Sequence, residues 1–146
     1  MRKNAVHFLF VPVLLCALLI PRGWGRAQEK QESAGSGGRH PVLSEAVMCE
    51  GIEEGRPWNS GAVLSLGLGR AFCFTLFDPV PEKTYIYHNW FFHDSPSTRI
   101  RLTINPPRWG TYSSIQLREA DRGPWRVEVS DREGRILKIL RFSITD

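Results

Sequence analysis

The chain has 146 residues, of which 19 are basic and 15 acidic, and its formal net charge is +4. Residues 1–27 hold four basic residues and no acid, so fifteen bases and fifteen acids remain without them. A nucleic-acid-binding domain carries a surplus of positive charge that pairs with phosphates. The charge balance of residues 28–146 therefore argues against nucleic acid as a partner.

The N-terminus has the pattern of a secretory signal peptide. Two basic residues precede an apolar run at 8–20, and small residues at 25 and 27 precede a cleavage site at Gln28. The apolar run is shorter than the roughly 20 residues that a membrane-spanning helix needs. We expect a periplasmic or secreted protein that touches the membrane only through residues 1–27, before cleavage. A protein anchored by this segment, left uncleaved, is the alternative.

Residues 28–41, QEKQESAGSGGRHP, separate the signal peptide from the folded part. They are polar and small and include no aromatic residue, so they cannot bury enough apolar surface to offset the entropy of ordering. We expect a flexible, disordered linker there. The remaining residues, 42–146, are enough for one domain with a two-layer core.

The polarity pattern of residues 42–146 has a period of two, which predicts strands rather than helices. Ile100, Leu102 and Ile104 alternate with polar residues, and so do the apolar residues at 125–129. Further strands are expected near residues 44–50, 62–67, 70–77, 84–93, 111–118 and 135–144, with turns at Gly55–Gly61, Asp78-Pro79, Ser95-Pro96, Asn105–Pro107, Arg122–Pro124 and Asp131–Gly134.

This spacing of short strands predicts an all-β fold, an immunoglobulin-like β-sandwich of about seven strands. A small barrel is the alternative. In the last strand Lys138 interrupts the apolar face, so we expect a bulge or a sheet edge at that position.

Two cysteines, Cys49 and Cys73, remain after the signal peptide is removed. An even pair in an oxidising compartment predicts a disulfide. Closing this loop of about 25 residues stabilises a fold by roughly 3–4 kcal/mol on the chain-entropy model. Two buried thiols on neighbouring strands are the alternative.

The stretch TYIYHNWFFHD at 84–94 is the most aromatic in the folded part. Side chains alternate between the faces of a strand, so His88 and Trp90 share one face, and Tyr85, Tyr87 and Phe91 share the other. We expect Trp90 in the core with a hydrogen-bonded His88 beside it. We expect at least one aromatic ring of the second face to be exposed, where it offers a docking surface for a sugar or a protein.

The sequence offers little support for catalysis or metal binding. His88 and His93 are five positions apart, so strand alternation places them on opposite faces, and we expect neither a metal nor a cofactor. Ser113 and Ser114 lack the flanking glycines of a nucleophile elbow, and no phosphate-binding loop is present. We therefore expect no enzymatic activity. A small hydrolase using His88 with Ser113 or Ser114 is the alternative.

Several short motifs occur in a fixed order: I-x-H-x-W at 86–90, R-W-G-T-Y-S-S at 108–114, G-P-W-R-V-E-V at 123–129, D-R-E-G at 131–134 and R-F-S-I at 141–144. This ordered set resembles the bacterial family known as domain of unknown function 2914, over most of residues 46–145, including Cys49 and F-C-F-T at 72–75. Gly110 departs from the family pattern, which has arginine after the tryptophan. The resemblance implies an exported or membrane-attached bacterial domain, often at the C-terminal end of a chain, and no activity. The motif residues are His88, Trp90, Trp109, Tyr112, Ser113, Ser114 and Trp125.

The three motif tryptophans are expected to form the scaffold, with Trp125 packed in the centre of the sandwich. The polar motif residues, His88 and Tyr112–Ser114, either form a buried hydrogen-bond network or line a pocket. Together these features predict an exported, non-catalytic interaction module of the bacterial cell envelope that binds an unknown envelope protein or glycan. A purely structural accessory domain is a further alternative.

Overall fold

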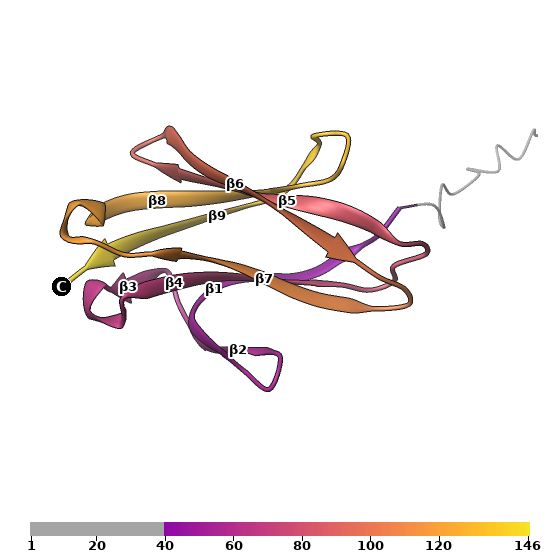
Figure 1. Cartoon of the computed structure of the whole chain (residues 1–146), viewed down its shortest axis with the longest axis horizontal. Helices are drawn as coiled ribbons and strands as arrows, with labels where there is room; N and C mark the ends of the chain where they lie inside the picture. Colours follow the sequence, from indigo (N-terminus) through magenta and orange to yellow (C-terminus); the bar gives the residue numbers. More distant parts are fainter. Residues whose placement is uncertain (1–39) are drawn as a thin grey trace, which may run out of the picture. The chain divides into compact units, whose positions relative to one another are not determined.

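The computed structural model describes residues 40–146, which form nine β-strands and two short 3-10 helices (Figure 1). The predicted signal peptide and most of the predicted linker lie outside the described residues. None of the elements in 40–146 is a helix long and apolar enough to cross a membrane. The elements are β1 (Leu43–Glu53), β2 (Arg56–Ser60), β3 (Val63–Ser65), η1 (Leu66–Leu68), β4 (Arg70–Phe77), β5 (Thr84–Phe92), β6 (Ser95–Ile104), β7 (Trp109–Gln116), η2 (Glu119–Asp121), β8 (Gly123–Ser130) and β9 (Ile136–Thr145).

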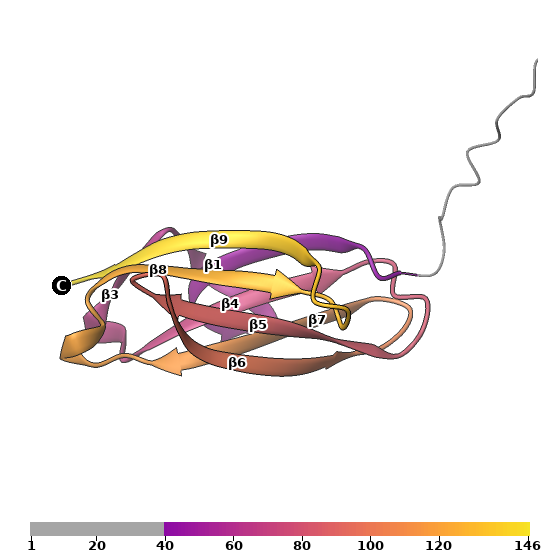
Figure 2. The ribbon, with the colours of Figure 1, turned by 90° about the horizontal axis from the view of Figure 1, so that it is seen from above.

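The strands form two sheets, which confirms the predicted all-β sandwich (Figure 2). One sheet has the order β2-β1-β4-β7 and is called sheet A here; the other, sheet B, has the order β3-β9-β8-β5-β6. Among the strands of residues 40–146, only β3 and β9 pair in parallel. In the immunoglobulin scheme, β1, β4 and β7 take the places of strands A, B and E, and β5, β8 and β9 those of C, F and G.

One of the nine strands, β2, was not expected from the sequence. Residues 56–60 were predicted as part of a turn around Pro57, but they pair with the end of β1 as a hairpin. Proline is tolerated there because β2 is an edge strand of sheet A. The hairpin turn is Glu54-Gly55, whose φ angles of 49° and 74° suit a tight two-residue connection.

The turn between β5 and β6 lies two residues earlier than predicted. His93 and Asp94 have positive φ values of 46° and 63°, so they form the connection, and Ser95 already belongs to β6. Histidine and aspartate are among the non-glycine residues that enter this backbone region most readily. The prediction that His93 lies on a strand face is therefore wrong.

The last strand, β9, has the irregularity that was predicted at Lys138. Val129 pairs with Lys138 and Ser130 with Ile136, so the ladder passes over Leu137. This extra residue is a β-bulge, and the side chain of Lys138 is exposed.

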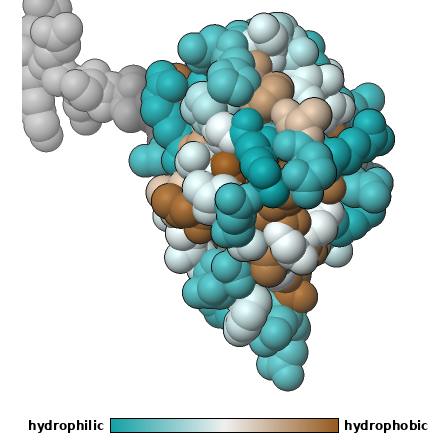
Figure 3. Space-filling model, turned by 90° about the vertical axis from the view of Figure 1, so that its left-hand side faces the viewer, coloured by the Kyte–Doolittle hydropathy of each residue, from teal (hydrophilic) through white to brown (hydrophobic). Residues whose placement is uncertain are grey.

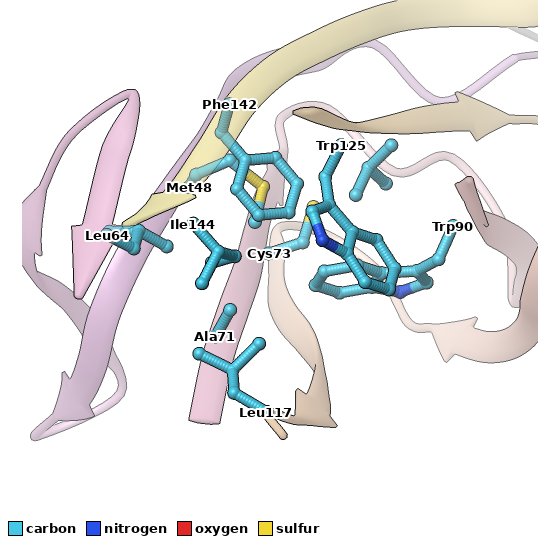
Figure 4. Close-up of a cluster of buried hydrophobic side chains, with 10 residues drawn as sticks. Met48, Leu64, Ala71, Cys73, Trp90, Leu117, Trp125, Phe142 and Ile144 are labelled. Atoms are coloured by element: carbon cyan, nitrogen blue, oxygen red, sulfur yellow. The ribbon is translucent and has the colours of Figure 1, made fainter. Parts of the chain in front are cut away.

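The core lies between the sheets and includes two of the three motif tryptophans (Figure 4). Trp90 is 1% exposed and Trp125 5% exposed, and the ring centroids of Trp125 and Phe142 are 6.2 Å apart. Trp90 lies on β5, the counterpart of the strand that carries the central tryptophan in immunoglobulin domains. Trp109 is 39% exposed, so the prediction that it belongs to the scaffold is wrong. It is the first residue of β7, an edge strand of sheet A.

The predicted disulfide is absent, because Cys49 and Cys73 are both free and buried. They lie on the neighbouring strands β1 and β4, but Cys73 pairs with Met48 and Cys49 pairs with Phe72. Alternation along β1 turns Met48 and Cys49 to opposite faces of the sheet, so Cys73 belongs to the core and Cys49 faces away from it. Burial raises the pKa of both thiols.

Candidate functional site

Four polar side chains are hydrogen-bonded to one another between the sheets. Nδ1 of His88 on β5 lies 2.8 Å from Oγ of Ser113 on β7, and its Nε2 lies 3.2 Å from Oγ1 of Thr75 on β4. The indole Nε1–H of Trp90 donates to the same Ser113 oxygen at 3.1 Å. These four residues, called the His88 network here, join β4 and β7 of sheet A to β5 of sheet B.

One tautomer of His88 satisfies every group of the His88 network. Ser113 accepts from Trp90 and is free to donate its own hydrogen to an unprotonated Nδ1. The imidazole proton then lies on Nε2 and is donated to Thr75, whose hydroxyl donates to the carbonyl of Thr111 at 3.4 Å. Within residues 40–146, no buried side-chain nitrogen or oxygen lacks a partner. The hydrogen bonds therefore assign the neutral Nε2–H form.

The His88 network is closed to solvent. His88 is 0% exposed and Ser113 5% exposed. Burial lowers the pKa of His88 from 6.5 to about 4, because the imidazolium form would lose its hydration. Of the two arrangements expected for the polar motif residues, His88 and Ser113 thus adopt the buried network rather than the lining of a pocket.

The predicted binding patch, Tyr85, Tyr87 and Phe91, lies on the outer face of sheet B, as strand alternation requires. All three residues are only half-buried, and a guanidinium lies over each ring. The Cζ atoms lie 3.8, 3.6 and 4.0 Å from the ring centroids in the pairs Arg101–Tyr85, Arg99–Tyr87 and Arg126–Phe91, respectively. This face, called the arginine-covered face here, therefore presents cations instead of the expected bare aromatic surface.

The three arginines of this face differ in their acidic partners. Arg126 pairs with Glu128 at 3.0 Å and also with Asp94. Within the part of the chain that the structure describes, neither Arg99 nor Arg101 forms a salt bridge. A guanidinium stacked on a ring keeps its planar set of N–H donors for other hydrogen bonds. Arg99 and Arg101 are thus held in place with donors to spare.

The more exposed aromatic rings are on the opposite sheet. Trp58 on β2 and Tyr112 on β7 are each 48% exposed. Alternation from the inward-facing Ser113 turns Tyr112 outward, and its ring centroid lies 6.1 Å from that of Phe72 on β4. Phe74, which is 3% exposed, and Leu76 lie on the same side of sheet A. The five residues Trp58, Phe72, Phe74, Leu76 and Tyr112 are called the aromatic face here. Apolar side chains also reach the surface among hydrophilic ones at the end of the domain shown in Figure 3.

An open groove of about 260 Å³ lies on this side of sheet A, beside the turn between β1 and β2. Phe74 and Leu76 line it, together with Gly110, Glu54, Gly55, Arg56 and Arg108. A Cβ atom on Gly110 would lie 3.3 Å from the ring of Phe74, so a longer side chain there would extend over the groove. The glycine that departs from the expected arginine therefore keeps the groove open. Arg108, which also lines the groove, pairs with Asp78 at 3.4 Å.

Apart from the exposed Trp109, the motif residues thus lie either in the core or on the outer side of sheet A. His88, Trp90, Ser113 and Trp125 are in the core, Tyr112 is on the aromatic face, and Ser114 accepts a hydrogen bond from Nη1 of Arg70 at 2.8 Å. The sequence prediction missed Trp58 because residues 55–61 were interpreted as a turn. The alternation that placed the side chains of β5 would also have turned Tyr112 outward once Ser113 was assigned to the core.

Within residues 40–146, no three His, Cys, Asp or Glu side chains are grouped closely enough to hold a metal ion. The candidate site residues named from the sequence are distributed over a buried network and two outer faces.

Comparison with known proteins supports the resemblance found in the sequence. No curated protein matches the chain. Residues 83–144 match a family model described as Protein of unknown function (DUF2914). The match extends from just before β5 into β9 and includes the His88 and Trp125 motifs, whereas Cys49 and residues 72–75 lie outside it. The predicted resemblance to this family is therefore confirmed over residues 83–144.

Proposed function

We propose that this chain is an exported, non-catalytic interaction module that binds a protein partner through the aromatic face. The observation that carries the proposal is the exposure of Trp58 and Tyr112, each 48%, on one side of sheet A beside an open groove. Tryptophan, tyrosine and arginine are the residues that most often dominate the affinity of protein interfaces. Arg56 and Arg108 line the same groove. Export is supported by the signal-peptide pattern of residues 1–27.

The burial of the His88 network supports the non-catalytic part of the proposal. Ser113 and His88 have the separation expected of a nucleophile and its base, 2.8 Å. However, Ser113 also accepts from Trp90, and both residues are closed to solvent. A general base works best with a pKa near the working pH, whereas the pKa of His88 is lowered to about 4.

A purely structural accessory domain is the second candidate, and one observation favours it. Three motif residues, His88, Trp90 and Ser113, are buried and paired with one another, as a scaffold would require. This candidate assigns no partner to the aromatic face. The two proposals therefore differ in what happens when that face is altered.

The test is affinity capture from an envelope extract with the purified protein as bait. We compare the wild type with a Trp58→Ala/Tyr112→Ala variant and with a control, Ile136→Ala/Ile139→Ala. The control removes two side chains that are 53% and 41% exposed on β9 of the other sheet. A partner retained by the wild type and the control but lost by the first variant supports the proposal. Identical partners for all three baits, or none for any, would favour the structural candidate.

A further inference from the structure

One edge of sheet B is open along a full strand. β6 is the last strand of the sheet and pairs only with β5, so within residues 40–146 the other side of its backbone has no strand partner. β6 is ten residues long and runs along the border of the sheet in Figure 2. An unpaired edge of this length offers a row of N–H and C=O groups to an additional extended peptide.

The outer side of this edge is cationic. Arg99 and Arg101 are two residues apart on β6, so their Cα atoms are roughly 7 Å apart along the strand. Each guanidinium is held over a tyrosine ring and has no acidic partner in the described part of the chain. Acidic side chains at alternate positions of an extended peptide have the same spacing.

The inner side of the same edge is apolar. Ile100 and Leu102 pair with His88 and Ile86, which face the core, so their side chains also point inward. Both are only half-buried, although they pack against the two core clusters. A strand added at this edge would cover them with its own inward-facing residues.

We propose that the edge of β6 binds an extended peptide segment of a partner protein in which acidic and apolar residues alternate. The acidic residues face Arg99 and Arg101, and the apolar residues cover Ile100 and Leu102. A second copy of β6 does not fit, because antiparallel pairing would bring these arginines opposite one another, and like charges across a ladder are destabilising. This site lies on sheet B and does not depend on the aromatic face of sheet A.

The test uses the full-length protein and a synthetic nine-residue peptide in which glutamate and valine alternate. We expect chemical-shift changes at the backbone amides of residues 97–103, and an affinity that falls as salt is added. Arg99→Gln/Arg101→Gln should weaken binding by about tenfold or more, since each charge-assisted pair contributes a large share of such an interaction. The control, Arg70→Gln/Arg118→Gln, removes the same charge from exposed positions outside β6 and should leave the affinity unchanged.

Two further peptides test strand addition itself on the wild-type protein, so the result does not depend on a variant that folds. In one peptide, N-methylation blocks the backbone N–H groups that point to one side of the extended chain. In the other peptide, it blocks those that point to the opposite side. One should lose binding and the other should keep it, since only one side of the peptide faces β6.

Several outcomes would overturn the proposal. Equal binding of the two methylated peptides, or equal binding of a block-ordered peptide of the same composition, would show that the arginines attract any anion. The same conclusion would follow if a sulfated polysaccharide shifted the same amide signals and bound more tightly than the alternating peptide. Unchanged affinity in the Arg99→Gln/Arg101→Gln variant, or no binding at all, would show that the arginines only protect the edge against aggregation.

Discussion

His88 is the residue whose surroundings say most about this fold. A histidine that is fully buried loses its hydration, so it is tolerated only when both ring nitrogens have partners. Ser113 and Thr75 supply those partners from two different strands of the opposite sheet. If β4 or β7 slipped by one residue, Thr75 or Ser113 would point away from His88. The His88 network therefore favours one register of β5 against β4 and β7.

The first prediction concerns the pH dependence of stability. The pKa of His88 is about 4 in the folded protein and near 6.5 when unfolded, so between these values the unfolded chain binds more protons. The contribution of His88 is fully present above pH 6.5 and is lost progressively as the pH falls toward 4. This contribution to the free energy of unfolding is about 3 kcal/mol, which is the difference between the two pKa values multiplied by the energy of one pKa unit. Urea unfolding at pH 7, 5.5 and 4.5 measures it.

Carboxylates titrate in part of the same pH range, so His88→Gln serves as the control and should show a shallower slope. The His88 ring is also observable directly by NMR, where it should remain neutral at pH 5.5. A ring that titrates near 6.5 in the folded protein would contradict the assignment of a buried neutral imidazole.

The second prediction compares the two faces of β5. Trp90 is 1% exposed and lies in the larger core cluster, so Trp90→Ala should lower the free energy of unfolding by roughly 3–5 kcal/mol. Tyr87 is half-buried under Arg99, and Tyr87→Ala should cost clearly less, about 1–2 kcal/mol, through lost ring contacts. Urea unfolding of both variants decides the matter. Equal losses would mean that the ring under Arg99 carries as much of the stability as the core tryptophan.

At the level of the strands, the sequence predicted what depends on alternation and missed what depends on neighbours. The apolar positions of β6 and β8 alternate strictly, so their inward faces follow from the sequence alone. β2 was hidden by Pro57, because a proline argues against a strand until the strand is known to be at an edge. The pairing of β1 with β4 was not predictable either, since a shift by one residue exchanges the faces without changing the composition.

The third prediction follows from that register. Because Cys49 and Cys73 face opposite sides of sheet A, both should remain thiols in the folded protein. An alkylating reagent should modify neither in the native state, since both are 0% exposed, and both after unfolding in urea without reductant. Mass spectrometry counts the added groups. An unfolded, unreduced protein that gains none would show that the two residues form a disulfide and that β1 is shifted against β4.

At the level of the whole molecule, the fold was more predictable than the candidate site. A sandwich follows from many short alternating strands in about one hundred residues. Which outer face presents bare aromatic rings depends on where long side chains lie. The tyrosines of β5 are covered because Arg99 and Arg101 extend across from the neighbouring strand, whereas Tyr112 remains exposed on β7. No periodicity in the sequence specifies such coverage.

The last prediction concerns export, for which residues 1–27 supply the only signal. Cleavage after Ala27 should give a product that begins at Gln28 and carries equal numbers of basic and acidic residues. β1 begins at Leu43, so the cut lies outside the sandwich and should leave its stability unchanged. Ala27→Leu places a large residue at the cleavage position and should yield an uncleaved, membrane-associated protein. N-terminal mass spectrometry of the two fractions distinguishes the products, and a full-length wild-type protein held in the membrane would favour the anchored alternative.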